Sequence, residues 1–132
     1  MAIENLLGTS ALSFLASSSV STTLNYRFVV LGTAAQTVDD AGAGAKTIGI
    51  RRDTPTTADG TRPVEVVTTQ GALAKLTLGV GGATKGDWLK SDAFASGIVA
   101  SVDHDVVGAQ AMEAGVAGDV ITVMIQKFTL SA

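Results

Sequence analysis

The residue types best suited to acid–base or metal chemistry meet at one place, where the only histidine, His104, stands between Asp103 and Asp105. An imidazole and two carboxylates are common zinc ligands. Neighbouring side chains of an extended segment point to opposite faces, which argues against a shared ion. No nucleophile-elbow sequence accompanies the histidine. The pattern therefore predicts an exposed turn rather than a metal or catalytic site.

The glycine-rich segment 79–86 is only superficially like a phosphate-binding loop. A P-loop carries Gly-Lys-Ser/Thr, whereas here Thr84 precedes Lys85 and Gly86 follows it. The dinucleotide pattern of spaced glycines also fails, and no helical pattern follows. Lys85 in a turn is compatible with a biotinyl or lipoyl carrier, but the Met or Asp expected immediately before a carrier lysine is absent. We expect no nucleotide and no other cofactor.

Adjacent Asp39 and Asp40 offer oxygen ligands to a hard cation. Calcium needs six or more oxygens from a defined loop, and the chain lacks that motif. Both residues stand in segment 38–45, whose glycines and alanines predict a flexible loop. We therefore expect a solvated turn here and no metal.

The bulk composition excludes several classes of partner. The formal net charge is -3, and the basic residues are scattered apart from Arg51 and Arg52, which disfavours contact with nucleic acid. No apolar run reaches the roughly 18 residues of a membrane helix. No Lys or Arg precedes Arg27, so the charged start of a secretory signal is missing. Small residues dominate, and such chains often complete a thin core by oligomerising.

Residues 1–25 are predicted to form an extended N-terminal arm, which leaves residues 26–132 as a β domain. No charged residue lies between Glu4 and Arg27. The arm is either a frayed terminus or a segment that packs on a partner subunit. In the second case its contact surface consists of large apolar side chains, namely Leu6, Leu7, Leu12, Phe14 and Leu15.

The polar loop over residues 51–62 is the second candidate contact region, because loops carry recognition more often than cores do. Its three arginines, Arg51, Arg52 and Arg62, are suited to an acidic partner surface. They are equally suited to the ordinary role of keeping a surface soluble, and both interpretations stay open at this point.

Segment 120–125, Val-Ile-Thr-Val-Met-Ile, organises the predicted fold. Most of its residues are β-branched, which favours a strand. Both faces are apolar, so we expect a strand that is buried on both sides or central in a sheet. Further strands are predicted over 26–31, which would be the first, and over 64–69 and 73–78. Helix formers at 109–114 fill too short a segment before a glycine-rich turn, and extended structure is expected there.

A hairpin-like unit of two extended segments occurs twice. Residues 47–52 parallel residues 106–111, with Gly49 aligned to Gly108, and residues 63–67 parallel residues 119–123. A glycine inside a strand marks a bulge or a close approach of backbones. The prediction is one all-β domain, a compact β-barrel or β-sandwich-like body with an extended N-terminal arm.

This pattern resembles the family of phage head decoration proteins, also called capsid cement proteins, over about residues 26–128. The segments that carry the resemblance are 47–50, 63–67 with Gly71, 85–89, 97–99, 107–109 and 118–123. The resemblance implies a non-enzymatic β protein, commonly trimeric, that binds the outside of an assembled capsid. It implies the major capsid protein and further copies of the chain as partners on the virion surface. The arm lies outside the resemblance.

Two other classes of function fit a small β fold. One is a carbohydrate-binding module on a virion surface, which would use exposed aromatic side chains, and aromatic residues are only 5% of the chain. The other is the carrier domain considered above for Lys85. Glycan binding would identify the first, and the mass of the purified protein would identify the second.

Overall fold

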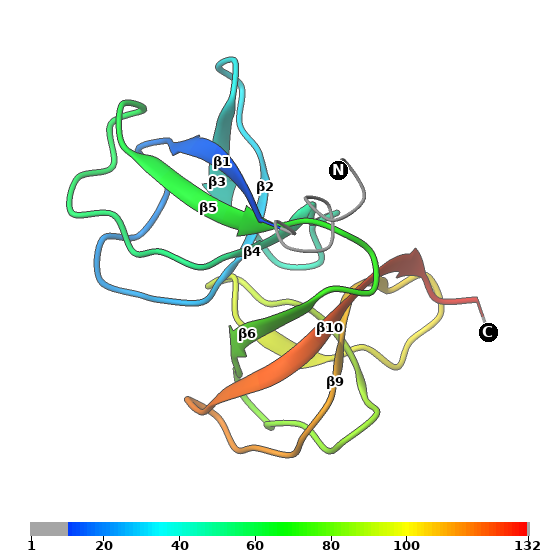
Figure 1. Cartoon of the computed structure of the whole chain (residues 1–132). Coiled ribbons are helices and arrows are strands. Elements are labelled where there is room, and N and C mark those ends of the chain that lie inside the picture. Colours follow the sequence, from blue (N-terminus) through cyan, green and yellow to red (C-terminus); the bar gives the residue numbers. More distant parts are fainter. Residues whose placement is uncertain (1–10, 132) are drawn as a thin grey trace, which may run out of the picture.

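The computed structural model describes residues 11–131 as ten strands joined by turns. The strands are β1 (Ala11–Ala16), β2 (Phe28–Leu31), β3 (Thr37–Asp40), β4 (Gly49–Arg51), β5 (Pro63–Val67), β6 (Leu73–Thr77), β7 (Trp88–Ser91), β8 (Gly97–Val99), β9 (Val106–Ala111) and β10 (Val120–Thr129). The predicted all-β fold is confirmed. Its two five-stranded sheets form the upper and lower halves of the molecule in Figure 1. In the described part of the chain, no helix has the length and apolar character needed to cross a membrane.

The first five strands close into a barrel with the order β1-β3-β2-β4-β5. β1 completes the ring by pairing in parallel with β3 and antiparallel with β5. Because successive side chains alternate between the faces of a strand, one set of valines points inward. Val29, Val38, Val64 and Val66 are fully buried in this interior. Each such side chain stabilises the barrel by roughly 1.5–3 kcal/mol before ordering costs.

Two barrel strands correct the sequence predictions. β1 lies within the predicted arm, so the first strand is Ala11–Ala16 and not residues 26–31. β3 begins just before the predicted loop 38–45 and covers its first three residues. Both strands are rich in small and polar residues, but their backbone groups are paired with neighbouring strands, which satisfies donors and acceptors that would otherwise be lost. The expected boundary at residue 26 therefore does not separate an arm from a body, because residues 11–16 belong to the barrel.

The last five strands form the second sheet, in the order β6-β10-β9-β7-β8. β10 is central, between β6 and β9, as the sequence predicts. Only one face of β10 is buried: Ile121, Val123 and Ile125 are inside, whereas Val120 is 41% exposed. Of the two predicted alternatives, the central position therefore holds and burial on both sides does not. A register shift between Ile125 and Phe128 bends the end of this strand.

The two halves repeat one topology. If β1 to β5 are replaced by β6 to β10 in sequence order, the barrel order becomes β6-β8-β7-β9-β10. Read in the other direction around the ring, this is the order of the second sheet, opened between β6 and β8. The parallel contact of β1 with β3 corresponds to a parallel bridge between Leu78, just after β6, and Gly97 in β8. The predicted hairpin units are β4–β5 and β9–β10, one in each half.

The register repeats as well. Two rows of cross-strand neighbours correspond. The first, which we call the barrel row, is Ala11, Val67, Ile50 and Phe28. The second, which we call the second-half row, is Leu73, Met124, Gln110 and Trp88. The sequence alignment of the two units was thus one residue out of register, since Ile50 corresponds to Gln110.

Left-handed backbone positions recur at matching places in the two halves. Residues with positive φ correspond in pairs: Tyr26 with Gly86, Gln36 with Ala95, and Gly44 with His104. Side chains differ at each pair, so what is repeated is the path of the backbone. We conclude that the two halves are structural repeats that differ in their side chains.

One difference between the halves explains why only the first is a closed barrel. In the barrel the Leu15 N–H donates to the Gln36 carbonyl at 2.8 Å. The corresponding groups of the second half are the Thr77 N–H and the Ala95 carbonyl. They bond instead to the Tyr26 carbonyl at 3.0 Å and the Phe28 N–H at 2.9 Å. Residues 26–28 of the first half thus fill the seam between β6 and β8.

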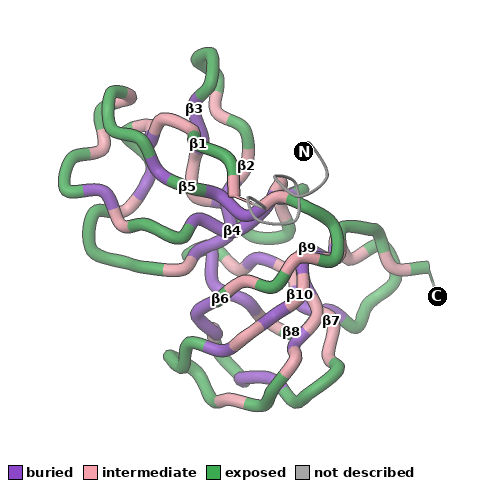
Figure 2. The backbone as a smooth tube through the Cα atoms, in the orientation of Figure 1, coloured by how far each residue is buried: buried purple, intermediate pink, exposed green. Residues whose placement is uncertain are grey.

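Residues 26–28, which we call the wedge, join the cores of the two halves. Phe28, Ile50 and Val67 of the barrel belong to the same apolar cluster as the interior of the second half, and buried backbone runs through the junction near β4 in Figure 2. Gly108 is needed at this junction, because a Cβ there would lie 2.6 Å from the Phe28 ring. The neighbour at Gly108 is a side chain, whereas the predicted close approach of backbones occurs at Gly49, where a Cβ would meet the Val67 carbonyl.

Candidate functional site

Three of the predicted arm residues lie in β1, beside the predicted loop arginines. Leu15 pairs with Pro63, the neighbour of Arg62, and Ser13 pairs with Glu65, which contacts Arg52. β5 therefore lies between the two candidate contact regions, which adjoin at Ser13 and Leu15, whereas Leu12 pairs with Val66, a buried residue of the barrel interior. Leu6 and Leu7 lie outside the described residues.

The three β1 side chains differ in what they offer to a partner. Leu12 is 54% exposed. Phe14 is half-buried and packs against the valines inside the barrel, and Leu15 is also half-buried. Of the three, Leu12 therefore presents the most apolar surface, while Phe14 acts mainly in folding.

Arg51 corrects the prediction of a contact residue. Its side chain is fully buried, so it has no surface to present to a partner. Its guanidinium is bidentate on Asp40, with Nε donating to Oδ1 at 2.7 Å and Nη2 to Oδ2 at 3.1 Å. Two carbonyls, of Leu24 and Asp53, accept further N–H groups of the guanidinium at 2.7 and 2.8 Å. The prediction of a solvated turn at Asp40 was also wrong, because this carboxylate is largely buried in its pair with Arg51.

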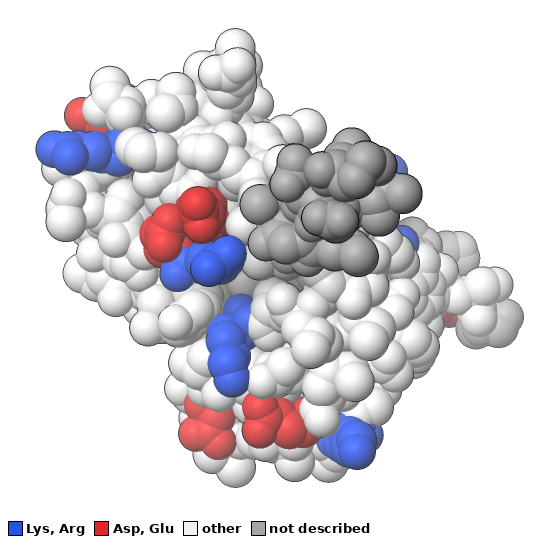
Figure 3. Space-filling model, in the orientation of Figure 1, with Lys and Arg blue, Asp and Glu red and all other residues white. Residues whose placement is uncertain are grey.

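The other two arginines are exposed. Arg52 lies 3.6 Å from Glu65, with both side chains about half exposed. Arg62 follows a turn in which the Thr61 hydroxyl and N–H donate to Asp59 and hold the pKa of that carboxyl below its usual value, helped by the charge of Arg62. Figure 3 shows small patches of both charges on an otherwise uncharged face. This surface suits a contact with mixed charges and apolar groups.

Arg27, which the sequence did not single out, ties the barrel to the second half. Its Nη1 donates to the Ser96 hydroxyl, and its Nε donates to the Asn25 carbonyl at 3.0 Å. The side chain is 8% exposed. Burial lowers the pKa of Arg27, and the positive charge of Arg51 lowers it further, while two nearby carboxylates oppose both effects. The role of Arg27 is structural.

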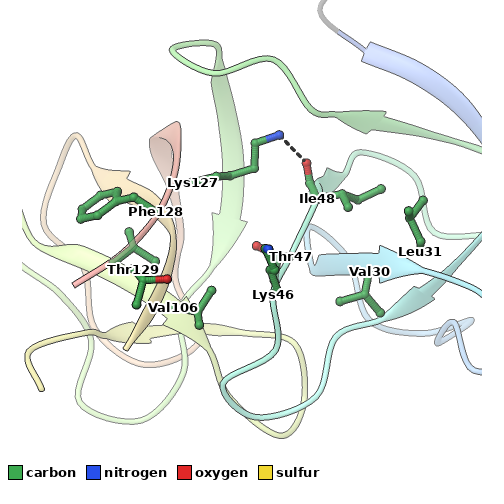
Figure 4. Close-up of a pocket in the computed structure, with 10 residues that line it drawn as sticks. Val30, Leu31, Lys46, Thr47, Ile48, Val106, Lys127, Phe128 and Thr129 are labelled. Carbon is green, nitrogen blue, oxygen red and sulfur yellow. Dashed lines mark hydrogen bonds between the residues drawn. The ribbon is translucent and has the colours of Figure 1, made fainter. Parts of the chain in front are cut away.

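An apolar groove of about 530 Å³ lies between the halves. Figure 4 shows Val30, Leu31 and Ile48 of the barrel on one side and Phe128 of β10 on the other. The amine of Lys127 crosses the groove and donates to the Ile48 carbonyl at 3.1 Å and the Thr68 carbonyl at 2.7 Å. The amine therefore also fastens the two halves together.

The acidic and histidine residues considered for chemistry are dispersed. His104 lies in an exposed turn beside Asp103, at 3.1 Å, as predicted. Asp105 points elsewhere and accepts a hydrogen bond from Lys90 at 2.8 Å. This bond, followed by the Val102 N–H, lowers the pKa of Asp105. Within residues 11–131 no three metal-ligating side chains gather in one place.

The groove and the buried arginines were not predicted from the sequence. The pairing of Arg51 with Asp40 joins β4 to β3, and nothing in the spacing of the two residues announces it. The sequence signal that could have indicated burial is the place of Arg51 between two apolar strands. A strand flanked by core valines leaves an arginine little access to water.

No protein-family model matches this chain, and no curated protein matches it. Among solved structures, the fold is similar to the crystal structure of the head fiber gp8.5 N base in bacteriophage phi29. The TM-score is 0.63 at 17% sequence identity, and the match covers 92% of this chain and 98% of that chain. The resemblance to phage head proteins seen in the sequence is confirmed at the level of the fold.

Proposed function

We propose that this chain is a structural protein of a phage head, a decoration or cement protein that attaches to the outer surface of the assembled capsid and stabilises it. The observation that supports this most is the fold shared over nearly the full length of the phi29 head fiber base. The sequence resemblance to decoration proteins supports the same function independently. The chain then acts on the virion and has no enzymatic activity.

The side of the barrel formed by β1, β5 and the 52–62 loop is our candidate for contact with the major capsid protein. Exposed Leu12 contributes apolar surface, and Arg52 and Arg62 contribute positive charge. We assign Leu6 and Leu7, which precede β1 in the sequence, to the same contact. Apolar groups give such a contact its free energy, and charges around them fix its orientation.

Self-association, with three copies as the expected number, is the second part of the proposal. It draws support from large apolar side chains that stay exposed, among them Leu31 at 63% and Leu73 at 59%. Where such side chains form a contiguous exposed apolar patch, the patch is typical of a contact surface. Oligomers also raise the strength of attachment, because each copy adds a binding site for a repeating shell.

Binding of the purified chain to undecorated capsids tests the function. We expect wild-type protein to sediment with the capsids and to raise the temperature at which they release their contents. Leu12→Glu combined with Arg52→Glu should weaken binding by about tenfold or more, since both changes fall in the proposed contact. Val116→Glu, at a residue that is 68% exposed on the other half, is the matched control.

Two results would contradict the proposal in different ways. Wild-type protein that stays in the supernatant at every concentration would refute capsid attachment. Equal binding by wild type and the Leu12, Arg52 double variant would leave attachment standing but remove the barrel side as its site. Salt dependence separates the two contributions, because added salt weakens the charged contacts more than the apolar ones.

A further inference from the structure

The corresponding rows of the two halves differ in what covers them. Phe28 and Ile50 of the barrel row are fully buried, and Val67 is 3% exposed, because the second half packs over them. In the second-half row Leu73 is 59% exposed, and Trp88 is only half-buried. The second half covers the barrel row, but no segment within residues 11–131 covers the second-half row in the same way.

The second-half row has the composition of a contact surface. Trp88 packs edge-on against Phe128, with ring centroids 4.8 Å apart, and Phe128 itself is 37% exposed. Met124 lies between Leu73 and Gln110 in the row. Tryptophan, methionine and phenylalanine are enriched at the centre of protein interfaces, where they exclude water over a large area.

We propose that a second copy of this chain packs on the second-half row, formed by Leu73, Met124, Gln110 and Trp88. The argument is the internal repeat: in every molecule the corresponding row is an interface, and it is covered by a half with the same backbone. The proposal rests on the self-association proposed above and locates its contact.

The repeat also indicates which part of the neighbour makes the contact. The barrel row is covered by a second half, and a barrel has the same backbone as a second half. The neighbour therefore contributes its barrel. Within each molecule, Ser91 of the second half lies at the junction, where its carbonyl accepts a hydrogen bond from the Gly44 N–H. Leu31 is the barrel residue that corresponds to Ser91, so we place Leu31 in the contact. A contact between two different surfaces is head-to-tail, and a head-to-tail contact can close into a ring such as a trimer.

Sedimentation of single variants tests this assignment. Met124→Lys and Leu31→Glu alter opposite sides of the proposed contact, and each should shift the assembly toward the 13.3 kDa monomer, with association weakened by about tenfold or more. Leu73→Glu changes a more exposed position of the row and guards against a variant that fails to fold. Val80→Glu, at 87% exposure in a turn outside both surfaces, is the matched control and should associate like wild type.

Trp88 adds a direct readout, because it is the only tryptophan. Further burial of this partly buried indole on association should move the fluorescence maximum of wild-type protein to shorter wavelength as concentration rises. Unchanged association in folded Met124→Lys and Leu73→Glu would overturn the proposal, as would loss of association in Val80→Glu. A wild-type chain that stays monomeric would also overturn it, while capsid binding by that monomer would leave the proposed attachment intact.

Discussion

At the scale of single residues, the pairing of Arg51 with Asp40 explains how a small barrel tolerates a buried charge. An isolated guanidinium in an apolar interior is strongly unfavourable. Here a bidentate carboxylate and two carbonyls occupy its donors, and one of these carbonyls belongs to the loop that joins β1 to β2. The arginine therefore fixes the path of that loop while its own charge is compensated.

Removing the Arg51 side chain should destabilise the protein strongly. Arg51→Ala leaves Asp40, which is only 13% exposed, without its charged partner and opens a cavity. Breaking one side of a buried pair costs about 3–5 kcal/mol, so the urea midpoint should fall sharply. Arg52→Ala removes an exposed pair and should change the free energy of unfolding by less than about 1 kcal/mol. Equal effects in the two variants would show that Arg51 does not have this structural role.

The turn at Asp105 should make stability depend on pH. Hydrogen bonds from Lys90 and the Val102 N–H lower the pKa of Asp105 in the folded chain. A lowered folded pKa contributes stability that is present above the unfolded value, about 3.9, and is lost as pH falls through the folded pKa. Asp105→Asn should therefore lower the Tm near about pH 7, and the difference from wild type should shrink toward about pH 3. A constant difference across that range would contradict this.

At the scale of elements, β10 shows what a sequence pattern can predict. Its β-branched residues identified a strand, and a long apolar stretch identified a central one. The pattern did not show that Val120, Thr122 and Met124 form an outer face, because threonine and methionine are compatible with either side of a sheet. Central position and burial on both sides are separate properties, and only the first held.

A charge at the inner face of β10 should prevent folding. Val123 is fully buried between β6 and β9, within an apolar cluster. Val123→Asp therefore buries an unpaired carboxyl at a cost of several kcal/mol, a large part of the roughly 5–15 kcal/mol that stabilises a domain. We expect insoluble protein. Val120→Asp, in the same strand at 41% exposure, should express and melt almost like wild type; normal folding of both would refute the assignment of the inner face.

The elements that sequence reasoning missed have a common physical cause. β1 contains two alanines and one serine and β3 contains two aspartates, residues that have weak strand preference on their own. They are extended because the ring supplies partners on both sides. Asp39 and Asp40 read as a turn for the same reason, since the arginine that pairs with Asp40 stands in another strand. Local preference predicted the valine-rich strands well and could not predict strands that depend on closure.

At the scale of the whole molecule, the position of β1 changes what a truncation should do. A chain that begins at Ala11 keeps all ten strands, whereas one that begins at Tyr26 lacks β1 and leaves β3 and β5 each with one neighbouring strand instead of two. We expect the first to melt cooperatively near the wild-type Tm and the second to aggregate or lose its transition. Circular dichroism melts of both chains are the measurement. A cooperative melt of residues 26–132 would show that closure of the barrel by β1 is dispensable.

The wedge of residues 26–28 in the seam of the second half has a consequence for how the protein comes apart. The same three residues lead into a strand of one half and complete the hydrogen bonding of the other. Neither half can then lose its order alone, so heat and urea should reveal a single transition in which both halves take part. A polypeptide of residues 71–132 on its own carries an open slot, and a short peptide spanning residues 24–31 is the natural complement that would restore it in trans.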